Sequence, residues 1–175
     1  MGTNSRRNAR KPMRRLAPVA GALACALAVG AAAAPAAAIG RPEFLHFSDS
    51  FTEVDTETCG FPITLQLSFA ADVQFFYDRD GNLDHSINHI QLRGTDSAYG
   101  VTLSETADFT HTYDFTTGVN GDLGLLGMVS VPGGGAIGFD TGRILSDDDG
   151  NLLFVAGRHD VLSGDASAYC AAFTA

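Results

Sequence analysis

The sequence predicts an all-β protein folded as a single antiparallel meander. Two long runs, residues 61–77 and 101–115, alternate apolar and polar side chains with the period of two that belongs to a half-buried strand. Clusters of Gly, Asp, Asn and Pro separate these runs from weaker ones and have the composition of short turns. Seven or eight such strands favour an up-and-down β-barrel, which has no open edges. A β-sandwich is the alternative, because it also buries one face of each strand.

The run at residues 61–77 is the strongest strand signal. Its nine odd positions, from Phe61 to Tyr77, are apolar or aromatic, and the even positions between them are mainly polar. A helix would bring such residues round every side of its axis, so only a strand places them all on one face. Seventeen residues exceed the usual strand length. We therefore expect a bend or bulge near Ala70–Ala71.

The remaining elements follow from the same pattern. The run at 101–115 alternates again, and only the tail "LSGDASAYCAAF" reads as a short C-terminal helix, with Asp165 as its N-cap. Weaker strands are predicted in five segments: Phe44–Val54, Leu83–Arg93, Leu123–Val131, Ala136–Leu145 and Asn151–Ala156.

The first 38 residues are predicted to be an export signal. A cluster of basic residues precedes an Ala-rich apolar run that closes on "APAAAIG", the small-residue pattern of a cleavage site after Ala38. Residues 39–175 then form one secreted β domain. Export by the general secretory route or by the twin-arginine route, suggested by "SRRNARK", stays open. Lipoprotein anchoring through Cys25 is a further alternative.

The charge balance after this signal excludes several functions. Five arginines face twenty carboxylates there, a net charge of about −15, and Lys11 is the last lysine of the chain. Such an acidic protein repels phosphate backbones, which argues against nucleic-acid binding. No later segment is long and apolar enough for membrane insertion after signal cleavage. Without lysine, Schiff-base chemistry is also excluded.

Two cysteines remain once Cys25 has left with the signal. Cys59 and Cys170 are an even pair in an oxidising compartment, so we predict that they form one disulfide. It would tie the region after the first strand to the C-terminus. The alternative is two separate buried thiols.

The stretch "YDRDGNLDH", residues 77–85, resembles a calcium loop, because alternate positions from Asp78 onward carry Asp or Asn. The sixth loop position, however, is Leu83 rather than Gly, and the twelfth is His89 rather than Glu. An Asp-Gly pair between two extended runs predicts a β-hairpin tip instead, and "SDDDGNLLF" repeats it. We therefore expect two hairpin tips and no metal site, with a calcium-stabilised structural protein as an alternative.

Other polar residues could carry chemistry. His85 and His89 lie on one strand face but about 13 Å apart, too far to share a metal ion. Alternation places Glu105, His111 and Tyr113 on the apolar face of their strand, where they are candidate cavity residues of a cyclase-like or isomerase-like enzyme. An exposed strand end or a bulge that turns them outward is the alternative. Nothing in the sequence indicates a cofactor.

The order of the motifs "CGFP", "FFYDRDGN", "DDDGNLLFVAGRHD" and "YCAAF" after an Ala/Arg-rich signal resembles small secreted actinobacterial proteins of unknown function. That resemblance implies a β-barrel and an extracellular location, and it supplies no catalytic residues. The sequence therefore predicts a secreted, acidic β-barrel without enzymatic activity, which binds a small apolar ligand or serves as an extracellular interaction module.

Overall fold

The computed structural model describes residues 41–160, 163 and 165–175. The chain divides into two units, residues 1–34 and 35–175, and all described residues belong to the second. The predicted signal, its cleavage site and Cys25 lie outside the described residues. No helix in the described part of the chain is long and apolar enough to cross a membrane.

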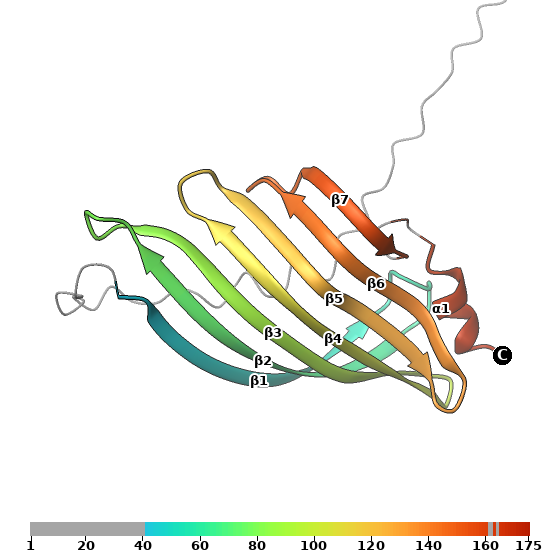
Figure 1. Cartoon of the computed structure of the whole chain (residues 1–175). Helices are drawn as coiled ribbons and strands as arrows, with labels where there is room; N and C mark the ends of the chain where they lie inside the picture. The colour runs from blue at the N-terminus through green and yellow to red at the C-terminus, as the bar shows by residue number, and fades with distance from the viewer. Residues whose placement is uncertain (1–40, 161–162, 164) are drawn as a thin grey trace, which may run out of the picture. The chain divides into compact units, whose positions relative to one another are not determined.

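Seven antiparallel strands and one short helix make up the described domain (Figure 1). The all-β prediction, the meander and the C-terminal helix are thereby confirmed, and the strands form one sheet rather than two. The elements are β1 (Glu43–Asp55), β2 (Ile63–Tyr77), β3 (Leu83–Ala98), β4 (Val101–Asp114), β5 (Val119–Val131), β6 (Gly135–Ser146), β7 (Leu152–His159) and α1 (Ser167–Ala172).

The sheet is ordered β1 to β7, and each strand pairs with its neighbours in sequence. Among the described residues no ladder joins β1 to β7, so the structure does not show a closed barrel. The predicted bend or bulge near Ala70–Ala71 is not a bulge, because β2 keeps one register with β1 and β3 until Phe76. The unbroken alternation explains this: an inserted residue would have turned one half of the strand's apolar side chains to the other face.

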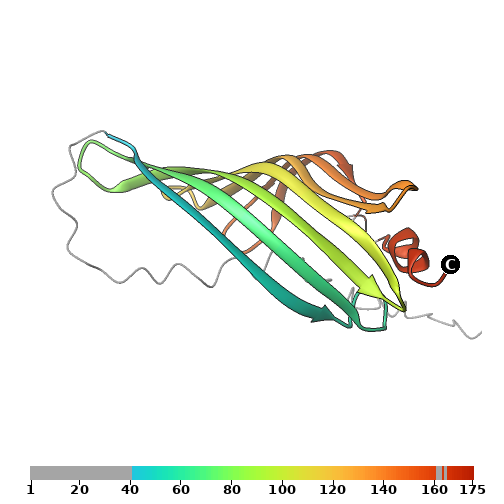
Figure 2. The ribbon, with the colours of Figure 1, turned by 90° about the horizontal axis from the view of Figure 1, so that it is seen from below.

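One face of the sheet, here called the inner face, carries the hydrophobic core. Alternate residues of β2 are buried on it, and Phe173, which follows α1, is 2% exposed and packs against them. Figure 2 shows α1 at one end of the strands. The main core cluster is Ile63, Leu65, Leu67, Ala98, Leu103 and Phe173, and a second cluster contains Ala71, Val73 and Ile90.

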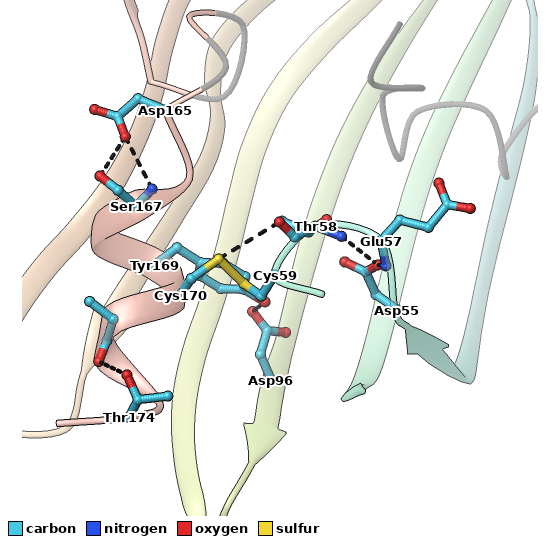
Figure 3. Close-up of a disulfide and its surroundings, with 11 residues drawn as sticks. Asp55, Glu57, Thr58, Cys59, Asp96, Asp165, Ser167, Tyr169, Cys170 and Thr174 are labelled. Carbon is cyan, nitrogen blue, oxygen red and sulfur yellow. Dashed lines mark hydrogen bonds between the residues drawn. A yellow bond between two sulfur atoms is a disulfide. The ribbon is translucent and has the colours of Figure 1, made fainter. Parts of the chain in front are cut away.

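A disulfide between Cys59 and Cys170 ties α1 to the segment that joins β1 and β2 (Figure 3). This confirms the predicted pairing and is consistent with an extracellular protein. Because the bond closes a loop between residues 111 positions apart, loss of chain entropy in the unfolded state stabilises the fold by about 4–5 kcal/mol.

Candidate functional site

Two carboxyl groups and a phenol meet beneath α1. Asp96 on β3 is 2% exposed, and its Oδ2 accepts a hydrogen bond of 3.0 Å from the Tyr169 hydroxyl of α1 (Figure 3). Glu105 on β4 is paired with Gly94, two residues before Asp96, so both acids lie on the inner face. Asp96 Oδ1 has no hydrogen-bond partner among the described residues. The side chains of Asp96 and Glu105 interact with each other, and this interaction contributes to the pKa shifts of both.

Burial dominates the electrostatics of this group. Burial, and then the charge of neighbouring Asp96, raise the pKa of Glu105 to about 7. Burial also raises the pKa of Asp96, and the charge of Asp55 acts in the same direction. The pKa of Tyr169 is raised by burial and by Asp96, so its hydroxyl stays protonated and donates. Near neutral pH, the two carboxyl groups can therefore hold one proton between them.

The structure does not bring together the three residues predicted to share a cavity. Glu105 and His111 lie on one face of β4, six residues apart, or about 20 Å at the usual strand rise. His111 Nδ1 lies 2.8 Å from Asp122 Oδ1 on β5. The Tyr113 hydroxyl donates a 2.9 Å bond to Asp148 in the β6–β7 turn. The three side chains thus belong to three separate polar groups.

Asp96 and Asp122 are the partners that the sequence analysis missed. The predicted strand ended at Arg93, because the residues that follow have turn composition, whereas β3 continues to Ala98 and carries Asp96 inward. The usable signal was the alternation of Leu92, Gly94, Asp96 and Ala98, which all fall on the inner face. Asp122 precedes the expected start of its strand at Leu123, so the face of the sheet on which its side chain lies could not be predicted.

The outer face carries a row of histidines and carboxylates across neighbouring strands. His46 Nδ1 lies 2.7 Å from Asp72 Oδ1, and His89 Nε2 lies 3.6 Å from Asp108 Oδ1. A hollow of about 310 Å³ lies there, lined by Phe44, Leu45, His46, Asp72, Val73, Gln74, Ile87 and His89. In the described residues, no group of three or more His, Cys, Asp or Glu side chains is arranged to hold a metal ion.

The two predicted hairpin tips have the same structure, which confirms that part of the sequence analysis. Asp78 Oδ1 accepts the backbone N–H of Asn82 at 2.8 Å, and Asp147 Oδ1 accepts that of Asn151 at 2.8 Å. In both tips, a glycine with positive φ precedes the Asn. The Asn side chain, followed by these backbone bonds, lowers the pKa of each Asp. Both carboxylates therefore already accept hydrogen bonds within their own turns.

The edge strands carry most of the exposed apolar surface. Within the described residues, thirteen large hydrophobic side chains are exposed, and eight of them lie on β1 or β7. On β7 they are consecutive, running from Leu152 to Val155. Exposed apolar side chains gathered beside an unpaired strand edge mark a surface for another chain.

Comparison with known proteins adds no assignment: no family model, no curated protein and no solved structure matches this chain.

Proposed function

We propose that this protein is a secreted, non-enzymatic interaction module that binds an extended segment of a partner along the free edge of β7. The observation that supports this most directly is the run of four exposed apolar side chains, Leu152 to Val155, on a strand that pairs only with β6 in the described residues. An added strand would satisfy the edge N–H and C=O groups and cover these side chains.

The number of strands favours an open edge over self-closure. In a meander of seven strands, β1 and β7 run in the same direction, so closing the barrel would require a parallel pair between them. Parallel pairing is somewhat weaker per residue than the antiparallel pairing of the rest of the sheet. An extended partner can instead lie antiparallel on β7. Closure into a barrel remains the competing proposal for how this edge is covered.

The small-ligand and enzyme alternatives have less support. A surface hollow of about 710 Å³ lies on β1, β2 and β3, and its side chains include Ser50, Thr52, Gln66, Ser68 and Arg93. That lining is too polar for an apolar ligand. Glu105 has the raised pKa of an acid–base group, but His111 and Tyr113 have partners elsewhere.

The test uses an isotope-labelled protein and a synthetic strand peptide of eight alternating Thr and Val residues. Titration by two-dimensional amide NMR should shift signals of β7 while leaving those of β1 in place. Val155→Lys, which puts a charge on the edge, should weaken binding at least about tenfold. Leu45→Lys on β1 is the matched control, because Leu45 is 45% and Val155 43% exposed. Shifts confined to other strands, or equal weakening by both variants, would contradict the proposal.

A further inference from the structure

We infer that the partner strand at β7 comes from a second copy of this protein, in an antiparallel β7–β7′ pair about a two-fold axis. The inference rests on the proposed function and names its partner. The observations that carry it are the unequal charges of the two free edges and the distribution of charge along β7.

The edge at β1 carries its own protection against pairing. Four of its seven inner-face residues, which pair with inner-face residues of β2, are acids: Glu43, Asp49, Glu53 and Asp55. Inward-pointing charges on an edge strand discourage another chain from adding to it. A β1–β1′ pair would gather all eight carboxylates of the two copies on one face, which like-charge repulsion opposes.

The edge at β7 lacks this protection. From Leu152 to Gly157 the strand has no charged side chain, and every one of these residues is exposed. In an antiparallel self-pair, Val155 of both copies would lie on the inner face and Phe154 of both on the outer face, because Val155 pairs with Ile144 and Phe154 with Leu145. Each copy would thus cover apolar surface of the other on both faces of the sheet.

The acidic turn at one end of β7 sets the direction of pairing. The strand follows an acidic turn, Asp147 to Asp149, and ends at Arg158 and His159. Arg158 already forms a 2.8 Å ion pair with Asp160 and lies over the Phe139 ring. In an antiparallel pair the acidic turn of one copy lies beside the arginine end of the other, and the two-fold axis repeats this contact. A parallel pair would instead place the two acidic turns side by side, where their carboxylates repel each other.

The symmetry of this contact limits the number of copies in the assembly. An antiparallel edge pair is isologous, so it closes with two copies and leaves only the protected β1 edges outside. A head-to-tail β1–β7′ contact would instead continue into larger assemblies. The paired strands span about 27 Å, a small contact, so the dimer should dissociate on dilution.

Sedimentation velocity over a range of concentrations, combined with amide hydrogen exchange of the oxidised secreted protein, tests the inference. We expect a reversible monomer–dimer equilibrium, in which the protection of residues 152–159 rises with concentration while that of residues 43–55 does not change. Val155→Lys should weaken the dimer at least about tenfold, since it sets two like charges near the axis. Leu45→Lys should leave the dimer constant unchanged. Arg158→Glu should weaken it, and Asp149→Arg in the same chain should restore it.

The outcomes separate the two proposals. If the protein is a monomer at all concentrations but still binds the Thr/Val peptide on β7, the inference of a dimer is wrong and the proposed interaction module stands. A monomer that binds no peptide would overturn both. Dimerisation through β1 or assembly beyond two copies would overturn the β7–β7′ pair. Protection of the β7 amides that point away from β6, if independent of concentration, would also overturn it, because a segment of the same chain would then cover the edge.

Discussion

The end of the sheet beneath α1 and the edge at β7 use similar side chains in opposite ways. Beneath α1, Phe173 is 2% exposed and sits among buried side chains of β2, β3 and β4. On β7, Phe154 is 47% exposed, like its three apolar neighbours. The first region has been covered by the chain itself, through a helix and a disulfide. The second has no cover from β1 among the described residues, and its apolar side chains stay exposed.

Removing the disulfide should have the largest effect on the difference between the region beneath α1 and the edge at β7. Cys59→Ser with Cys170→Ser should lower the free energy of unfolding by about 4–5 kcal/mol, because the unfolded chain regains the entropy of a long loop. Denaturant unfolding of the oxidised protein and the double variant measures the difference. Phe173 should become more accessible while β7 amides exchange as before. A loss below about 1 kcal/mol would mean that α1 is held by its packing alone.

A matched pair of phenylalanine substitutions compares the two regions directly. Phe173→Ala should cost about 3–5 kcal/mol, because it leaves a cavity in the main core cluster. Phe154→Ala should cost less than about 1 kcal/mol, since the side chain is largely exposed. Thermal and denaturant unfolding should be measured at concentrations too low for dimerisation. Equal costs would contradict the division into a covered and an uncovered region.

The buried carboxyl pair should make stability fall as pH rises. The pKa of Glu105 is raised from 4.5 to about 7 in the folded protein, so the folded state binds more protons than the unfolded state between these values. The stabilisation is complete below about pH 4.5 and is lost as pH rises through about 7, a change of about 3 kcal/mol.

Glu105→Gln isolates this contribution, because its amide stays neutral and can donate to Asp96. The variant should lose most of the decline in unfolding free energy between pH 5 and pH 8. The control is Glu53→Gln, which replaces an exposed carboxyl on the inner face of β1. It should keep the wild-type dependence of unfolding free energy on pH. If the two variants have the same slope, the Asp96–Glu105 pair does not govern this pH range.

Calcium should have the smallest effect. Asp78 and Asp147 already accept hydrogen bonds from Asn82 and Asn151 within their own turns. Binding an ion would break those bonds, so the melting temperature should be the same in millimolar calcium and in chelator. A reproducible rise with calcium would revive the calcium-stabilised alternative, since a ligand of the native state stabilises it.

Strand content and the disulfide could be predicted because they depend on local pattern and on elimination. The alternation in residues 61–77 and 101–115 gave β2 and β4 to within two residues at either end. Cys59 and Cys170 were the remaining cysteines, and the structure joins them. The Asp96 partner of Glu105 could not be assigned, because the Gly and Asp of "RGTDS" have turn composition although they continue β3.

By itself, the sequence determined most of the strand residues, the apolar faces of β2 and β4, and the two Asp-Gly hairpin tips. These features follow from side-chain periodicity and glycine geometry, which are local. Only the tertiary structure decided that β1 and β7 are edges, that Leu152 to Val155 are exposed, and that Asp96, Glu105 and Tyr169 meet. The physical reason is that an alternating strand has the same sequence whether its far side pairs with a neighbour or remains open.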